Sequence, residues 1–159
     1  MKSAIQRHLL GAMLAMAAAG FAVAAVALDT EAVVKERQAT MKQQGKDLGG
    51  IKAFLSGKGD QAAAQTAASG LTQTTRKIPS LFPAGTDKPS PDGKFQPKAA
   101  VWQEWDKFLA AQKQAVAKAD ALLAAVKTGD KAAIQTAFAD LGKNGCGNCH
   151  TNIREKLKD

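Results

Sequence analysis

Apolar residues in most of this chain recur every three or four positions, which is the spacing of an amphipathic helix. No segment shows the alternation of apolar and polar residues that a half-buried strand requires. We expect four helices, over residues 29–56, 60–78, 98–127 and from 130 through Leu157. The apolar stripe of the first helix consists of Val34, Met41, Leu48 and Leu55.

Residues that start and stop helices stand at the ends of these segments. Asp29 or Thr30, Asp60 and Asp130 are positioned to cap the first, second and fourth helices. Pro79 ends the second, and residues 79–97 are rich in proline and glycine, which predicts a long loop. The fold predicted is all-α, an antiparallel four-helix bundle of up-down-up-down topology. We expect Leu81 and Phe82 of the long loop to cover one end of its core.

The first 27 residues have the composition of an export signal. A short basic head with Lys2 and Arg7 precedes a run of apolar residues that ends in Ala25-Val26-Ala27, a cleavage site of small residues. We therefore expect a signal peptide at 1–27, a mature bundle domain at 28–159 and a periplasmic location, without stable membrane insertion after cleavage. An uncleaved membrane anchor is the alternative, because the run is about long enough to span a bilayer.

Charge narrows the range of partners. The whole chain has a net charge of +8, and cleavage removes Lys2 and Arg7 but no acidic residue, which leaves +6. The lysines are scattered and not interleaved with aromatic residues, so nucleic-acid binding is not predicted. They form either a solvated surface or a docking face for an acidic redox partner protein.

The chemistry of the chain is concentrated near its C-terminus, in Cys146-Gly147-Asn148-Cys149-His150, a C-x-x-C-H motif of covalent haem attachment. On a helix, Cys146, Cys149 and His150 share one side, so two thiols reach the haem vinyl groups while the imidazole reaches the iron. We expect one covalent haem c, with His150 as the proximal axial ligand of the iron.

Three other uses of a C-x-x-C pair are a structural disulfide, a redox-active dithiol and half of a zinc site. No predicted strand precedes the motif, as a thioredoxin-type dithiol would require. A zinc site would need a fourth ligand, and the chain after residue 27 has no other cysteine or histidine. An exported chain whose cysteines and histidine all lie in C-x-x-C-H therefore favours haem.

The mature chain resembles the cytochrome c-prime family, the class II c-type cytochromes. The C-terminal position of the haem motif separates that family from class I cytochromes, in which the motif lies near the N-terminus. The other matching features are Arg37-Gln38-x-x-Met41-Lys42, Leu81-Phe82-Pro83, Gly85-Thr86, the pair Trp102 and Phe108, and Arg154.

The resemblance implies a role for Met41 at the iron. Members with a high-spin haem have an apolar residue that is not a ligand at this position, whereas a low-spin subgroup has methionine. Met41 is thus expected as the distal axial ligand, and the alternative is a plain core methionine in the stripe of the first helix. The function implied is one-electron transfer and not enzymatic catalysis, by a monomer or homodimer. A five-coordinate protein that binds NO or CO is the alternative.

Four further residues are expected near the haem. The resemblance implies that Arg37 lies near the propionates, with Gln38 as a weaker candidate for a polar contact. Arg154 is four positions after His150 and is expected beside the proximal pocket, either on a propionate or at the surface. Trp102 is expected to pack against the haem as part of the core.

Overall fold

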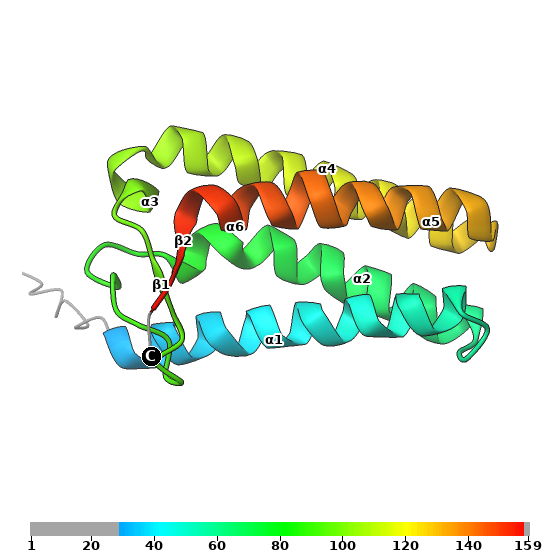
Figure 1. Cartoon of the computed structure of the whole chain (residues 1–159), viewed down its shortest axis with the longest axis horizontal. Helices are drawn as coiled ribbons and strands as arrows, with labels where there is room; N and C mark the ends of the chain where they lie inside the picture. Colours follow the sequence, from blue (N-terminus) through cyan, green and yellow to red (C-terminus); the bar gives the residue numbers. More distant parts are fainter. Residues whose placement is uncertain (1–28, 158–159) are drawn as a thin grey trace, which may run out of the picture.

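The computed structural model describes residues 29–157. Two long helices come first and pack side by side, and a third long helix and a segmented fourth one complete the bundle (Figure 1). The elements are α1 (Thr30–Leu55), α2 (Gln61–Lys77), η1 (Ile78–Leu81), β1 (Phe95–Pro97), α3 (Ala100–Gln103), α4 (Trp105–Thr128), α5 (Lys131–Asp140), η2 (Leu141–Gly147), α6 (Asn148–Ile153) and β2 (Arg154–Lys156).

The antiparallel four-helix bundle predicted from the sequence is confirmed. In Figure 1, α1 and α4 run from left to right, while α2 and the rod formed by α5 and α6 run back. The predicted caps are in place: the carboxylates of Asp29, Asp60 and Asp130 accept backbone N–H groups in the first turns of α1, α2 and α5. Gly129 ends α4 with a φ of 76°, a left-handed conformation that favours glycine. The expected signal peptide lies outside the described residues.

Two predicted helix boundaries were wrong. The third helix is broken at Glu104 into α3 and α4, and the Trp102 indole in α3 donates to the Phe82 carbonyl at 2.9 Å. The last helix ends at Ile153 and does not reach Leu157, because the backbone of 154–156 pairs as β2 with β1 of the long loop. The second departure comes from pairing between segments distant in sequence, which periodicity does not reveal.

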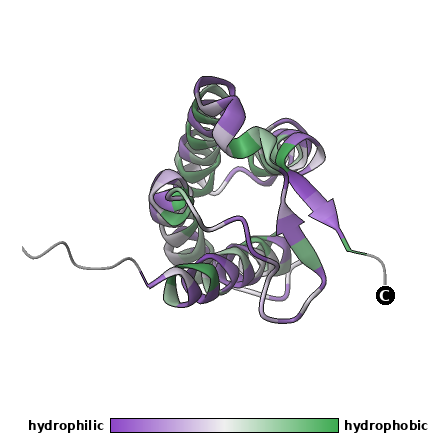
Figure 2. Ribbon diagram, turned by 90° about the vertical axis from the view of Figure 1, so that its left-hand side faces the viewer, coloured by the Kyte–Doolittle hydropathy of each residue, from purple (hydrophilic) through white to green (hydrophobic). Residues whose placement is uncertain are grey.

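The two strands form a small antiparallel sheet where no strand was expected. Phe95 pairs with Lys156, Gln96 with Glu155 and Pro97 with Arg154. Figures 1 and 2 agree that the sheet lies on the side of the bundle between α6 and α1. The long loop is therefore fastened to the chain that directly follows the C-x-x-C-H motif.

The core has two parts. The larger cluster fills the half of the bundle near the α1–α2 and α4–α5 turns and includes Ile51, Leu71, Leu122, Ile134 and Leu141. The smaller cluster consists of Leu81, Phe82, Val101 and Phe108, so the predicted folding of Leu81 and Phe82 over one end of the core is confirmed. Figure 2 shows hydrophobic and hydrophilic residues alternating along the helices, as in amphipathic helices. Within residues 29–157, no helix combines the length and hydropathy needed to cross a membrane.

Candidate functional site

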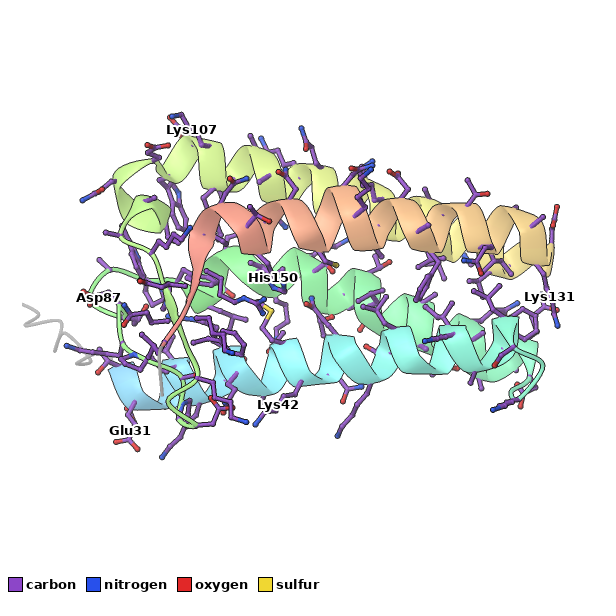
Figure 3. All side chains as sticks on the ribbon, viewed as in Figure 1. Glu31, Lys42, Asp87, Lys107, Lys131 and His150 are labelled. Carbon is purple, nitrogen blue, oxygen red and sulfur yellow. The ribbon has the colours of Figure 1, made fainter. Side chains whose placement is uncertain are left out.

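A pocket of about 280 Å³ lies between α1, the long loop and the end of α6, close to the lower end of the range for small-molecule sites. His150 of α6 and Met41 of α1 both line it. In Figure 3 the His150 side chain points from α6 toward α1. One imidazole and one thioether, carried by different helices, therefore share a single cavity.

The surroundings of the His150 imidazole favour its neutral form. Burial lowers its pKa from the usual 6.5, and the positive charge of Arg154 lowers it further. A neutral imidazole has a free nitrogen lone pair, which a protonated one lacks, and is the form that binds a metal. The surroundings of His150 therefore suit an iron ligand at neutral pH.

Met41 is half-buried and packs against the smaller core cluster, in which Phe82 also lines the pocket. Val34 and Gln38, neighbours of Met41 on α1, line the same cavity. Met41 is thus part of both the core and the pocket wall. This position is compatible with a core methionine and with an axial ligand.

Cys146 and Cys149 are free, half-buried thiols that do not themselves line the pocket. Burial raises the pKa of both thiols, and the neighbouring Cys146 adds to the effect on Cys149. A redox-active dithiol needs a lowered thiol pKa, because the thiolate is the nucleophile. These two cysteines therefore lack the electrostatics of a dithiol oxidoreductase.

The segment that leads into the motif is an unusual helix with two close approaches at glycines. Residues 141–147 are π-helical, a conformation often found at functional sites. A Cβ on Gly147 would stand 3.0 Å from the Gly142 carbonyl oxygen, and a Cβ on Gly145 would stand 2.8 Å from the Leu141 side chain. The run Gly-Lys-Asn-Gly-Cys-Gly is the signal of this tight turn in the sequence, and the expectation of one continuous helix from residue 130 overlooked it.

Arg37 lines the pocket, and its guanidinium is hydrogen-bonded to the long loop. Its Nε donates to the Leu81 carbonyl at 2.8 Å, and its Nη2 donates to the carbonyl and the hydroxyl of Thr86 at 3.0 and 2.6 Å. The guanidinium also lies 4.2 Å from the centre of the Phe82 ring. Burial lowers the pKa of Arg37 to about 10, so the group remains charged at neutral pH.

Of the other two residues expected near the haem, Arg154 lines the pocket and Trp102 does not. Arg154 lines the pocket beside His150, but as the first residue of β2 and not as the next turn of a helix, and its guanidinium lies 4.4 Å from the centre of the Phe95 ring. Trp102 is not among the residues lining the pocket. It packs against the smaller core cluster and donates to the carbonyls of Phe82 and Pro83.

Sequence reasoning missed a whole wall of the pocket. Residues of the long loop line it because β1 pairs with β2, and this pairing has no local signal in a segment rich in proline and glycine. These residues are Lys88, Ser90, Asp92, Phe95, Gln96 and Pro97.

The donor set fits a covalently attached haem. The pocket offers a neutral imidazole and a thioether, both of which are axial ligands of haem iron, and two free thiols lie on the turn that precedes the imidazole. In the described part of the chain, no three His, Cys, Asp or Glu side chains converge as a metal-ion site would require. The fold and site together define a haem-binding helical bundle.

Comparison with known proteins agrees with this class. The family model described as Cytochrome C′ matches residues 32–154. The chain is 31% identical over 154 residues to cytochrome c′ of Allochromatium vinosum, which covers 94% of this chain and 99% of that one. It is 33% identical over 125 residues to cytochrome c-556 of Agrobacterium fabrum, covering 77% and 81%. The crystal structure of cytochrome c′ from Thermochromatium tepidum matches with a TM-score of 0.72 at 29% identity, over 81% of this chain and 98% of that one.

The chain belongs to the cytochrome c′ family, and it binds one covalent haem c. Its coarse function follows: it is a haem-binding electron carrier or gas-binding protein and not a classical enzyme.

Proposed function

We propose that this protein carries single electrons through a low-spin haem c whose iron is ligated by His150 and Met41. The observation that carries the proposal is the shared pocket, in which one imidazole from α6 and one thioether from α1 line the same cavity. After residue 27 the sequence has no other histidine or methionine, so no other His or Met of the mature chain competes for either position.

The haem supplies the one-electron chemistry, and the chain's residues set its surroundings. The lowered pKa of His150 keeps the imidazole available as a ligand. Met41 is held by a rigid helix and by the smaller core cluster, so its sulfur does not depend on a mobile loop. A thioether ligand raises the reduction potential and fills the position that an external gas would otherwise occupy.

Two arginines and the attachment chemistry belong to the same proposal. Cys146 and Cys149 form the thioether bonds, a role that their position within about one turn of His150 supports. Arg37 would hold a propionate through its remaining nitrogen, Nη1, since its Nε and Nη2 donate to Leu81 and Thr86. Arg154 lies beside the proximal pocket with its charge exposed.

The experiment is the substitution Met41→Leu in the holoprotein. Leucine has a similar volume, so the fold survives while the ligand is lost. Wild type is expected to be low-spin in both oxidation states, with a weak near-infrared sulfur-to-iron band in the ferric form. Met41→Leu is expected to be high-spin, to lose that band, to have a lower potential and to bind CO rapidly.

The matched control is Leu109→Met, because Leu109 packs against the same core cluster but does not line the pocket. It is expected to leave the spectrum unchanged. A wild-type protein that is already high-spin at neutral pH makes Met41 a core residue only. The gas-binding function would then be the better account.

Export and partners complete the proposal. We propose a periplasmic protein cleaved before Leu28, which N-terminal sequencing of the purified protein tests; an intact residue 1 would contradict it.

The partner is a redox protein with an acidic face, since Lys42, Lys88 and Arg154 at the pocket are exposed. Electron-transfer rates should fall as ionic strength rises through about 0.1 M, where the screening length is about 10 Å. A rate independent of salt would contradict an acidic partner.

A further inference from the structure

Residues 88–97, here called the strap, form a compact turn with its own hydrogen bonds. The Ser90 N–H donates to the Phe95 carbonyl at 2.7 Å, and the Gly93 N–H donates to the Ser90 carbonyl at 2.8 Å. The Phe95 N–H donates back to the Ser90 hydroxyl at 3.2 Å. Gly93 has a φ of 68°, which a residue with a side chain rarely adopts. The strap is therefore a defined element despite its loop-like composition.

One end of the strap is fastened to the chain that follows His150. Beyond the β1–β2 pairs, the Lys98 N–H donates to the Ile153 carbonyl at 2.8 Å, and the Leu157 N–H donates to the Lys94 carbonyl at 2.9 Å. The Lys98 ammonium also donates to the Thr151 carbonyl at 3.0 Å. These bonds join the strap and the adjoining Lys98 to the last turn of α6, the helix that carries His150, and to the chain that follows it.

The other side of the strap meets the helix that carries Met41. Asp92 lies 3.9 Å from the ammonium of Lys42, the residue next to Met41. Figure 1 shows the strands crossing from the end of α6 toward the N-terminal half of α1. The strap thus spans the pocket from one proposed ligand helix to the other, and six of its residues line the cavity.

Phe95 is the bulkiest of those six, and Arg154 holds it. The Arg154 guanidinium lies 4.4 Å from the centre of the Phe95 ring, and both side chains line the pocket. A cation over an aromatic ring contributes about 0.5–1 kcal/mol at an exposed site, enough to bias the ring toward one position. The Phe95 ring is therefore a wall of the pocket whose position depends on a residue of β2.

We propose that Phe95, positioned by Arg154, determines which external ligands enter the haem pocket from solvent. Because the half-buried ring lines the pocket next to β2, we expect a ligand from solvent to displace it or to pass beside it. Phe95 sets access and Arg154 is a positioning residue that acts through it. The Met41 sulfur determines whether the sixth coordination position of the iron is free. The effect of Phe95 on access and the effect of Met41 on coordination can therefore be measured separately.

The test measures CO association with the ferrous holoprotein by flash photolysis. The background is Met41→Leu, which rests on the proposed function; if wild type is found to be five-coordinate, wild type itself is the background. Adding Phe95→Ala is expected to raise the association rate about tenfold, as for removal of a closing element. The matched control is Lys94→Ala, because Lys94 is exposed, neighbours Phe95 and does not line the pocket.

Arg154 is tested by Arg154→Gln and by Arg154→Lys, which keeps a cation. The glutamine variant is expected to raise the CO rate in the direction of Phe95→Ala and to speed amide hydrogen exchange in 94–98 and 154–157. The lysine variant should restore part of both properties. Haem content and far-UV circular dichroism identify any variant that fails to fold. If Arg154→Gln fails to fold, amide hydrogen exchange is compared between Arg154→Lys and wild type.

A rate for Phe95→Ala within a factor of two of its background would overturn the proposal. So would an equal increase in Lys94→Ala, which would assign the effect to general loosening of the strap. A failed Met41 assignment shows itself separately, in the spin state of wild type, and leaves this comparison intact.

Discussion

Arg37 offers the sharpest test of how the bundle holds its long loop. In Arg37→Met the side chain keeps an aliphatic stem but loses the guanidinium, and with it three hydrogen bonds and the cation over the Phe82 ring. Hydrogen bonds to charged groups contribute about 1.5–3 kcal/mol each, and a carbonyl left buried without a partner costs about 1–3 kcal/mol. The carbonyls of Leu81 and Thr86 would both lose their Arg37 donor.

One effect acts in the opposite direction. Burial lowers the pKa of Arg37 from its usual value to about 10, a cost of about 3 kcal/mol to the charged form, and methionine removes that cost. The lost bonds and unpaired carbonyls outweigh it. We expect a net loss of about 3 kcal/mol in the free energy of unfolding, or about 10 °C in Tm for a domain of this size.

The assay is urea and thermal unfolding of the holoprotein, followed by far-UV circular dichroism. The matched control is Arg76→Met. Arg76 pairs with Asp120 at 2.6 Å with both side chains exposed, so its loss should cost no more than about 1 kcal/mol. Arg37→Lys should rescue little, because an ammonium cannot reproduce the planar fork. Equal losses for Arg37→Met and Arg76→Met would refute the assignment of Arg37 as the clamp of the loop.

Two further substitutions test the C-terminal rod. Gly147→Ala places a Cβ 3.0 Å from the Gly142 carbonyl oxygen, a backbone atom that cannot rotate away. We expect a loss of about 1–2 kcal/mol in stability and a lower haem-to-protein ratio than in the exposed control Asn148→Ala. Equal values for both variants would contradict this. The Lys118 ammonium, 2.7 Å from Asp140, holds the pKa of that carboxyl below its usual 3.8, with a smaller contribution from Asn144. A lowered carboxyl pKa adds stability above about pH 4 and loses it as the pH falls through the lowered pKa. Wild type should therefore exceed Asp140→Asn in urea midpoint at pH 6 and match it near pH 2, and a difference that does not change with pH would contradict this.

Local features of the sequence were sufficient for the helices and for the attachment motif. The aspartates at 29, 60 and 130 cap helices through bonds to residues two or three positions away, and Gly129 ends α4 through its own backbone. The spacing of C-x-x-C-H is likewise a local property, since the chemistry of haem attachment is contained in five consecutive residues. These elements were predictable because every partner in them lies within about one helical turn.

Only the tertiary structure decided what surrounds that motif. Arg37 finds its acceptors 44 and 49 residues away, and β1 finds β2 nearly 60 residues away, so neither pairing leaves a periodic trace in the sequence. The end of α6 at Ile153 has the same origin, because long-range backbone hydrogen bonds there replace continuation of the helix. The strap and the Phe95–Arg154 contact exist for this reason, since backbone groups that a helix would satisfy locally are satisfied instead by a distant segment.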